Sequence, residues 1–344
     1  MILKDVFNAL LAEGVKEIIR NRFRSLFIWY DKQLYYHSYC KAVRYILHKS
    51  VLESDAKNYE YRYDEFLSQI KNKYIQTKIQ YNNLQCRDEE MHKCYEYVIK
   101  NGANVYCGLL DNISCFSEND VFYDDVNELF YGMYYGKKLY FSSDINDKRV
   151  ALNMLNGLAA EQSEHSPHKY LSDNFQINEG DVVFDIGCAD GNFALSIIEK
   201  VSKVYLFEVE EKWIKPLTLT FADYNDKVVI EKKLVGKTTN GDYVSVDDYC
   251  KKNGISKISL LKMDVEGYEN DVLEGARTMI GHGDIKKMAI CTYHNQDDEA
   301  RFSDKLKMYD IEMSEGYMLG SMIYDIWKIK PPYIAKAVMR ATIK

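Results

Sequence analysis

The sequence has no apolar run close to the roughly 18 residues that a membrane-spanning helix needs. The longest candidate, Leu26 to Tyr30, is far too short. No compact apolar block followed by a small-residue cleavage site stands at the N-terminus, so we expect no secretory signal. None of the eight cysteines belongs to a CxxC pair, which argues against a zinc knuckle or a thioredoxin-type site. We therefore expect reduced thiols and a cytoplasmic protein.

An excess of positive charge, which general nucleic-acid binding requires, is also missing. The chain has 45 Lys and Arg against 52 Asp and Glu, a net charge of −7, so we expect no nucleic-acid partner. Basic residues gather near the N-terminus. Between Leu3 and Ile19, apolar residues recur at three- and four-residue steps, as on one face of a helix, and Arg20, Arg22 and Arg24 follow. Such a helix can dock on the protein, join a homodimer, or touch the inner face of a membrane peripherally.

The chain divides into three predicted parts. Residues 1–120 form a helical region for docking or oligomerisation, with helical periodicity over 56–100. Residues 121–175 hold a β-hairpin from Glu128 to Phe141, turning at Gly136-Lys137, then a helix and a connector that resembles a lid. Residues 176–344 form the main domain.

From residue 180 onward, apolar runs alternate with segments long enough to be crossover helices. This pattern predicts an α/β fold with a mostly parallel sheet and helices on both faces. Ligands of such sheets bind beyond the C-terminal strand ends. The predicted strands are Val182–Ile186, Val204–Phe207, Val228–Ile230, Ile258–Met263 and Met288–Tyr293.

The first of these strands ends in FDIGCADGNFAL, a glycine-rich bend that predicts a nucleotide ligand. Its G-x-x-x-G spacing, Gly187 to Gly191, differs from the G-x-G-x-x-G of a dinucleotide site. Asp185 and Asp190 would repel a pyrophosphate and favour a ligand with a positive end, such as a sulfonium. The bend, with Asn192 beside it, therefore predicts S-adenosylmethionine in preference to NAD.

The other strand ends carry further acids and a histidine. Glu208 lies 21 residues after Gly187 and can accept both ribose hydroxyls, in NAD and S-adenosylmethionine alike. Asp264 and Glu266 follow the fourth strand, and His294 follows the fifth. Because neighbouring parallel strands end at one edge of a sheet, we expect Asp264, Glu266 and His294 to share a cleft.

The segments FDIGCADGNFAL, YLFEVE, LLKMDVEGYENDVLEGA and AICTYHNQDD resemble the FkbM family of S-adenosylmethionine-dependent methyltransferases. The resemblance implies a Rossmann-like, seven-stranded class I methyltransferase sheet over residues 176–344. It also implies a reversed last hairpin, supplied by Tyr309–Glu315 and Tyr324–Ile329, and methyl transfer to hydroxyls of glycans or natural products. Asp264 stands where related enzymes place a residue near the methyl group. Cys188-Ala189 and Val209 depart from the pattern of many members.

These features predict an O-methyltransferase acting on a saccharide or cell-envelope glycan precursor in polysaccharide biosynthesis. His294 is the expected base, with Asp264 orienting it and Glu266 nearby, because histidine titrates near neutrality. A divalent metal on Asp264, His294 and Asn295 is an alternative, but that ligand set suits Mg²⁺ only loosely. Methylation of a small natural product, a non-catalytic nucleotide-binding scaffold and an NAD-linked oxidoreductase are the alternative functions.

A polar cluster just before the first strand contains His165, His168 and Tyr170. Its position predicts a lid over the cofactor or the acceptor, since lids exclude water, and a capped loop is the alternative. Tyrosines also crowd the predicted hairpin, Tyr131 and Tyr134 among them. They can stack on a sugar or serve only for packing.

Overall fold

The structure is a computed structural model, which describes residues 72, 75–76, 79–80, 83, 86–110, 113, 115–319 and 331–344. The chain divides into two compact units, Met1–Lys71 and Asn72–Lys344, and every described residue lies in the second. The basic helix expected near the N-terminus lies outside the described residues. The three-part division of the chain stays a prediction. Within the described ranges, no helix combines the length and the apolar character that crossing a membrane requires.

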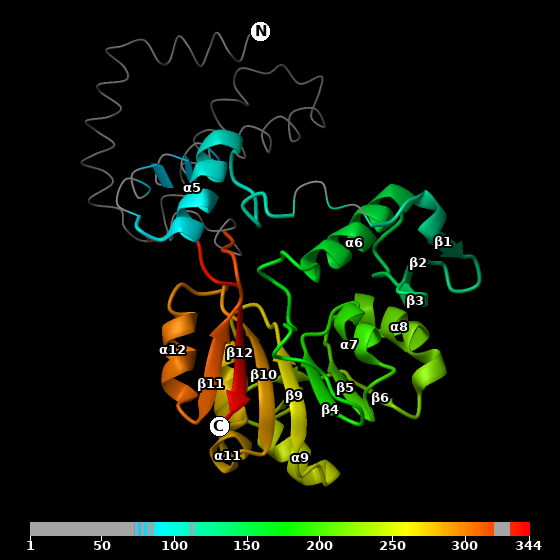
Figure 1. The fold of residues 1–344 in the computed structure, drawn as a ribbon. Coiled ribbons are helices and arrows are strands. Elements are labelled where there is room, and N and C mark those ends of the chain that lie inside the picture. Colours follow the sequence, from blue (N-terminus) through cyan, green and yellow to red (C-terminus); the bar gives the residue numbers. More distant parts are fainter. Residues whose placement is uncertain are drawn as a thin grey trace, which may run out of the picture. The chain divides into compact units, whose positions relative to one another are not determined.

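A seven-stranded sheet forms the centre of the second unit, in the order β11-β12-β10-β9-β4-β5-β6 (Figure 1). Strands β4, β5, β6, β9 and β10 run parallel, and β12 runs antiparallel to both of its neighbours. The bounds are Val182–Ile186 (β4), Lys203–Phe207 (β5), Val228–Glu231 (β6), Ile258–Met263 (β9), Ile285–Cys291 (β10), Tyr309–Met313 (β11) and Val338–Ile343 (β12). The predicted fold class is confirmed, and the reversed strand is β12, next to the edge strand β11.

The prediction for the last hairpin was wrong in its second strand. The partner of β11 is Val338–Ile343, and not Tyr324–Ile329, which lies outside the described residues. Strand β12 lies between β10 and β11 and is covered on both faces, so that Val338, Met339 and Ala341 are all fully buried. An interior strand of this kind requires a nearly continuous run of small or apolar side chains.

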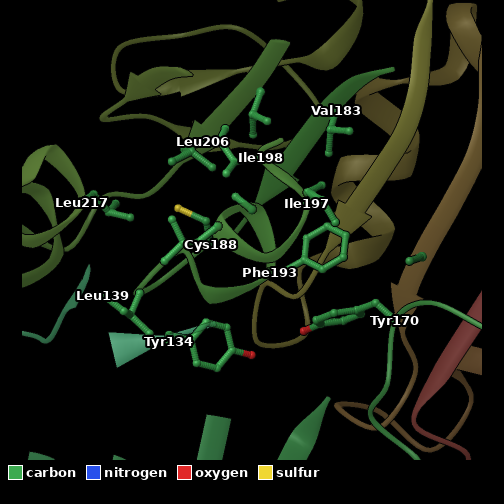
Figure 2. Packing of buried hydrophobic residues seen from close by; sticks show 14 of the residues in the cluster. Tyr134, Leu139, Tyr170, Val183, Cys188, Phe193, Ile197, Ile198, Leu206 and Leu217 are labelled. Carbon is green, nitrogen blue, oxygen red and sulfur yellow. The ribbon is translucent and has the colours of Figure 1, made fainter. Parts of the chain in front are cut away.

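Helices cover both faces of the sheet. On one face, α7 (Asn192–Ile197) and α8 (Glu211–Thr220) share a core with Val183 and Leu206, and Figure 2 shows Phe193, Ile197 and Leu217 of these helices there. Helix α6 (Lys148–Glu161) joins the same core through Ala151 and Leu155 and packs on the smaller sheet described below. The other face, with Phe184 and Ile186, packs on α9 (Val246–Asn253), α10 (Glu269–Gly275), α11 (Arg277–His282) and α12 (Asp298–Lys305). Successive residues of β4 thus belong to opposite cores. The helical segment after β9 is interrupted at Ala276, which separates α10 from α11.

A smaller antiparallel sheet precedes the main domain. It contains β1 (Val121–Asp124), β2 (Leu129–Tyr134) and β3 (Lys137–Tyr140), so the predicted hairpin gains a third strand. The two-residue turn is Tyr135-Gly136, both with positive φ, one position before the predicted turn. The backbone N–H of Tyr140 donates to Thr220 Oγ1 of α8 at 2.9 Å, which fastens this sheet to the main domain.

The remaining elements are short or lie at the margins. Helix α5 (Glu89–Asn101) packs its Tyr95 and Val98 in a separate small core with Leu319 and Ile334. The 3-10 helices η1 and η2 cover Glu118–Asp120 and Ala222–Tyr224, and β7 (Leu234–Val235) pairs with β8 (Tyr243–Val244).

The bend after β4 packs directly on the end of β9. Gly187 has a φ of 70°, and a Cβ on it would lie 2.0 Å from the backbone oxygen of Asp264. Gly254, which ends α9, has a similar φ of 66°, but a Cβ there would meet no atom within 4 Å. The two glycines share a backbone conformation and differ only in crowding.

We expect Gly187→Ala to lower the free energy of unfolding by about 2–5 kcal/mol, because a backbone clash adds to the cost of the left-handed conformation. Gly254→Ala, the matched control, should lose only about 1–2 kcal/mol. Urea denaturation of both variants measures the difference. Equal losses would contradict the close packing of this bend on Asp264.

Candidate active site

The glycine-rich bend connects β4 to α7 at the C-terminal edge of the sheet. The N–H groups of Gly187 and Cys188 donate to the carbonyl of Phe207, at 3.0 and 3.3 Å. Gly191, in the left-handed conformation, is the N-cap of α7. The bend is therefore held against the end of β5, at the edge where parallel sheets bind ligands.

Asp185 forms a buried ion pair within this bend. Its Oδ1 lies 2.9 Å from Lys262 Nζ, and the two side chains are 1% and 5% exposed. Lys262 Nζ also donates to the carbonyl of Gly187 at 2.8 Å. Burial raises the pKa of Asp185, and the charge of Lys262 opposes that rise. Asp185 thus fixes the bend through Lys262. The role of Lys262 was not predicted, although a lysine inside an apolar strand calls for a buried partner.

Asp190 is the second carboxyl of the bend, and its side chain is buried. Its Oδ1 accepts the N–H of Asn192 at 2.8 Å. Burial raises the pKa of Asp190 to about 7 despite this bond. A positive charge placed beside it would reverse that effect and favour the ionised form.

Glu208 follows β5 and is fixed by three backbone donors. Its Oε1 accepts the N–H groups of Val209 and Glu210, at 2.6 and 2.8 Å, and its Oε2 accepts that of Ala189 at 3.1 Å. Because Ala189 belongs to the bend, the carboxylate is attached to the predicted cofactor turn. This placement suits a carboxylate that accepts ribose hydroxyls.

Asp264, directly after β9, is surrounded by hydrogen-bond donors. The hydroxyls of Tyr170 and Tyr293 donate to it at 3.1 and 3.2 Å. The Nε2 atoms of His168 and His294 lie 3.5 and 3.4 Å from its two oxygens. Burial acts to raise the pKa of Asp264, but the His168 contact and the nearby positive charges lower it far below its usual value. This carboxylate therefore stays ionised at neutral pH.

His294 is oriented by a carboxylate that was not predicted. Its Nδ1 lies 2.8 Å from Oε1 of Glu269, which is fully buried in α10 and also accepts the N–H of Val265 at 2.9 Å. Burial acts to lower the pKa of His294, but the Glu269 bond and the charges of Asp264 and Glu266 raise it overall. Glu269 is the final acid of the DVEGYE segment, and its place in that motif was the sequence signal that could have identified it as a site residue.

The structure brings Asp264, Glu266 and His294 together, as the strand ends predict. His294 Nε2 lies 3.4 Å from Asp264 and 3.6 Å from Oε2 of Glu266, whose side chain is 84% exposed. Asn295 instead directs its amide to Asp298, at 3.3 Å.

Two groups of side chains around Asp264 have ligand atoms within 4.8 Å of one another. One joins Asp264 with His168 and Cys291, and the other joins it with Glu269 and His294. In the first group, Cys291 Sγ lies 3.7 Å from His168 Nε2, and the other spacings are the ion pairs of Asp264 and His294 described above.

The segment with the predicted lid residues lies partly inside the protein. His165 is exposed on the turn after α6, whereas His168 and Tyr170 are buried beside Asp264. Arg340 of β12 donates to the carbonyls of Lys169 and Tyr170, at 2.7 and 3.0 Å. These bonds fasten the segment to the sheet, so His168 and Tyr170 form a wall around Asp264.

The sequence of residues 144–317, just over half of the chain, matches the methyltransferase FkbM domain. The chain belongs to the FkbM methyltransferase family. It has the class I methyltransferase fold of that family. No match was found among curated proteins.

Several solved methyltransferases are similar in part. The FkbM methyltransferase from Methylobacillus flagellatus KT is 18% identical, over 55% of this chain and 54% of that chain, with a TM-score of 0.37. This chain thus matches about half of that protein's length. TrmK from M. capricolum, in complex with S-adenosyl-homocysteine, is 14% identical over 51% and 70%, with a TM-score of 0.34. An rRNA methylase from Streptococcus thermophilus is 12% identical over 48% and 89%, with a TM-score of 0.33.

We expect Lys262→Met to lower the free energy of unfolding by about 3–5 kcal/mol, because it leaves the buried Asp185 carboxylate without its partner. The double variant Asp185→Asn with Lys262→Met should regain part of that loss, since it contains no unpaired charge. Urea denaturation at neutral pH compares the two. A double variant no more stable than Lys262→Met would show that the ion pair is not the reason for the loss.

Proposed function

We propose that the protein is an S-adenosylmethionine-dependent O-methyltransferase whose acceptor is a hydroxyl of a saccharide or cell-envelope glycan precursor. The observation that carries the proposal is the Glu269–His294 contact of 2.8 Å, next to Asp264 and at the same sheet edge as the glycine-rich bend. An oriented histidine beside a fixed carboxylate is suited to removing a proton from a hydroxyl. Methylation of a small natural product remains the alternative, because it uses the same base.

The residues of the bend fit S-adenosylmethionine. Glu208 would accept the ribose hydroxyls, and the buried Asp190 carboxyl would gain from a cationic ligand. Tyr134 of β2 adds a third feature, because its side chain is buried and its hydroxyl interacts with Asn192, the first residue of α7. The pKa of Tyr134 is raised by burial and then by nearby charges, Asp190 among them, so it lies near the bend.

S-adenosylmethionine supplies a methyl group on a positively charged sulfur. Glu269 holds the proton of His294 on Nδ1, so Nε2 is the nitrogen that can take the acceptor's proton. With S-adenosylmethionine held by Glu208 and the glycine-rich bend, Nε2 of His294 would take the hydroxyl proton, and the cofactor would supply the methyl group to the freed oxygen and leave as a neutral thioether. Asp264 stays ionised and stabilises the imidazolium that forms.

Asp264 itself is a weaker candidate for the base. A carboxylate whose pKa lies far below its usual value has little affinity for a proton at neutral pH. His294, whose pKa is raised, has more. Asp264 is therefore assigned to orientation and charge.

The tyrosines of the small sheet pack mainly on other rings. The Tyr131 ring centroid lies 5.3 Å from that of Phe122 and 5.2 Å from that of Tyr140. This supports the packing alternative for Tyr131 over stacking on a sugar.

We expect S-adenosylmethionine binding at pH 7 to release about half a proton from Asp190, since half of these groups are protonated when pH equals pKa. Calorimetry in two buffers of different ionisation enthalpy measures the release. The control variant, Asp190→Asn, keeps an acceptor for the Asn192 N–H but has no proton to lose at this position. We therefore expect it to release about half a proton less than the wild type on binding. Absence of any binding heat in the wild type would refute the cofactor assignment, and equal release by both proteins would exclude Asp190.

We expect the imidazole of His294 to titrate above its ordinary value of 6.5, and Glu269→Gln to lower its pKa by about 1, because the variant removes the buried negative partner. Histidine-labelled protein followed by NMR gives the titration of the seven histidines, and His294→Ala identifies the signal. An unchanged midpoint in Glu269→Gln would mean that Glu269 does not set the protonation of His294.

A further inference from the structure

A pocket of about 290 Å³ lies between α6 and the segment that follows α5. The residues of its wall that matter here are Asn104, Tyr106, Asn153, Gly157 and Glu161. None of these was among the predicted site residues. Ligand pockets commonly enclose roughly 300–1,000 Å³, so this one is suited to a single small group.

One face of α6 forms a wall of the pocket. Asn153, Gly157 and Glu161 follow one another at four-residue steps, which places them on the same side of the helix. The opposite side, with Ala151 and Leu155, is buried in the main core. The face turned to the pocket is therefore polar and supplies an amide and a carboxylate.

Gly157 leaves space above this helix. A glycine inside a helix costs about 1 kcal/mol relative to alanine. A Cβ on Gly157 would meet no atom within 4 Å, so packing within the described protein does not require the glycine. The missing side chain instead keeps the pocket open.

The Tyr106–Glu161 pair lies in the wall of the pocket, and Tyr106 packs on the same core as Tyr293, the partner of Asp264. The Tyr106 hydroxyl donates to Oε1 of Glu161 at 2.7 Å. Burial and Glu161, followed by the charge of Asp264, raise the pKa of Tyr106. Tyr106 in turn is among the groups that raise the pKa of Tyr293, which hydrogen-bonds to Asp264. The pair thus lies on the side of the pocket that feels the charge of Asp264.

Asn156, another wall residue, has a structural role. Its Oδ1 accepts the N–H groups of Cys115 and Phe116, at 2.7 and 2.9 Å, and its Nδ2 donates to the carbonyls of Phe116 and Leu152 at 3.2 Å. These four bonds fix the segment at Cys115 to α6. Recognition is therefore assigned to Glu161 and Tyr106, with Asn153 on the same face.

We propose that this pocket is the acceptor subsite and that it takes one uncharged sugar ring, an inference that rests on the proposed function. Sugar hydroxyls can donate to Glu161 and to the phenol oxygen of Tyr106, and they can accept from amide groups. Among the wall residues that the structure describes, Glu161 is charged and none is basic. A phosphate or a uronic acid carboxylate would therefore be repelled, which selects a neutral hexose over a charged one.

The test uses the full chain loaded with S-adenosylhomocysteine and observes binding of methyl hexopyranosides by NMR. The probes are the neutral methyl glucoside, galactoside and mannoside, with methyl glucuronide as the anionic comparison. We expect at least one neutral probe to bind with a Kd of about 1–10 mM, and the glucuronide to bind at least about tenfold more weakly. Absence of neutral binding up to about 50 mM would overturn the proposal.

Two variants test the location of the subsite. Gly157→Leu fills the pocket and should weaken neutral-probe binding by at least about tenfold, whereas Gly281→Leu, at an equally open position in α11, should leave it unchanged. Glu161→Gln should bring the glucuronide affinity to within about threefold of the neutral probe. Unchanged neutral binding in Gly157→Leu, or unchanged discrimination in Glu161→Gln, would place the subsite elsewhere.

Binding of S-adenosylhomocysteine is measured on the same samples and separates the two ideas. Cofactor-product binding without sugar binding would refute the subsite and leave the cofactor assignment standing. Loss of both in the wild type would refute the proposed function itself. Retained S-adenosylhomocysteine binding in Gly157→Leu and Glu161→Gln shows that each variant is folded.

Discussion

The buried ion pair between Asp185 and Lys262 determines how the two halves of the site meet. It joins the end of β4 to β9, and the same lysine holds the carbonyl of Gly187 at 2.8 Å. Gly187 in turn packs on the backbone oxygen of Asp264 so closely that no side chain fits between them. Methyl transfer depends on alignment of the acceptor, methyl carbon and sulfur. This contact fixes the cofactor bend relative to Asp264 without any ligand.

The sequence predicted the parts of the site that depend on local pattern. Apolar runs predicted the bounds of β4 and β9, and the acids at their ends predicted carboxylates that lie at one edge of the sheet. It did not predict which side chains pair across the fold. Lys262 was taken as part of an apolar run and Glu269 as part of a motif, because both act through partners in other segments. The predicted partner of β11 was wrong for the same reason, because the packing of distant segments decides which strand pairs with it.

Asp264 shows how distant segments act on one group. His168 comes from the connector before β4 and His294 from the end of β10, and both lie within 3.5 Å of the carboxylate. The lowered pKa of Asp264 means that its stabilising effect is present above its usual pKa of 3.8 and is lost as pH falls through the folded-state value. The same contacts that stabilise the folded connector therefore keep a negative charge beside His294, the base of the proposed function.

The four acids of the site differ in charge because their surroundings differ. Asp185 is neutralised by Lys262, Glu208 is bound by backbone N–H groups, Asp264 is held ionised, and Asp190 has a pKa of about 7. Counting carboxylates in the glycine-rich bend therefore overstates the negative charge that faces a ligand. Under the proposed function, selection of a cation over a diphosphate would depend instead on Asp190, which would gain its charge when a positive group binds, and on Asp264, which is already ionised.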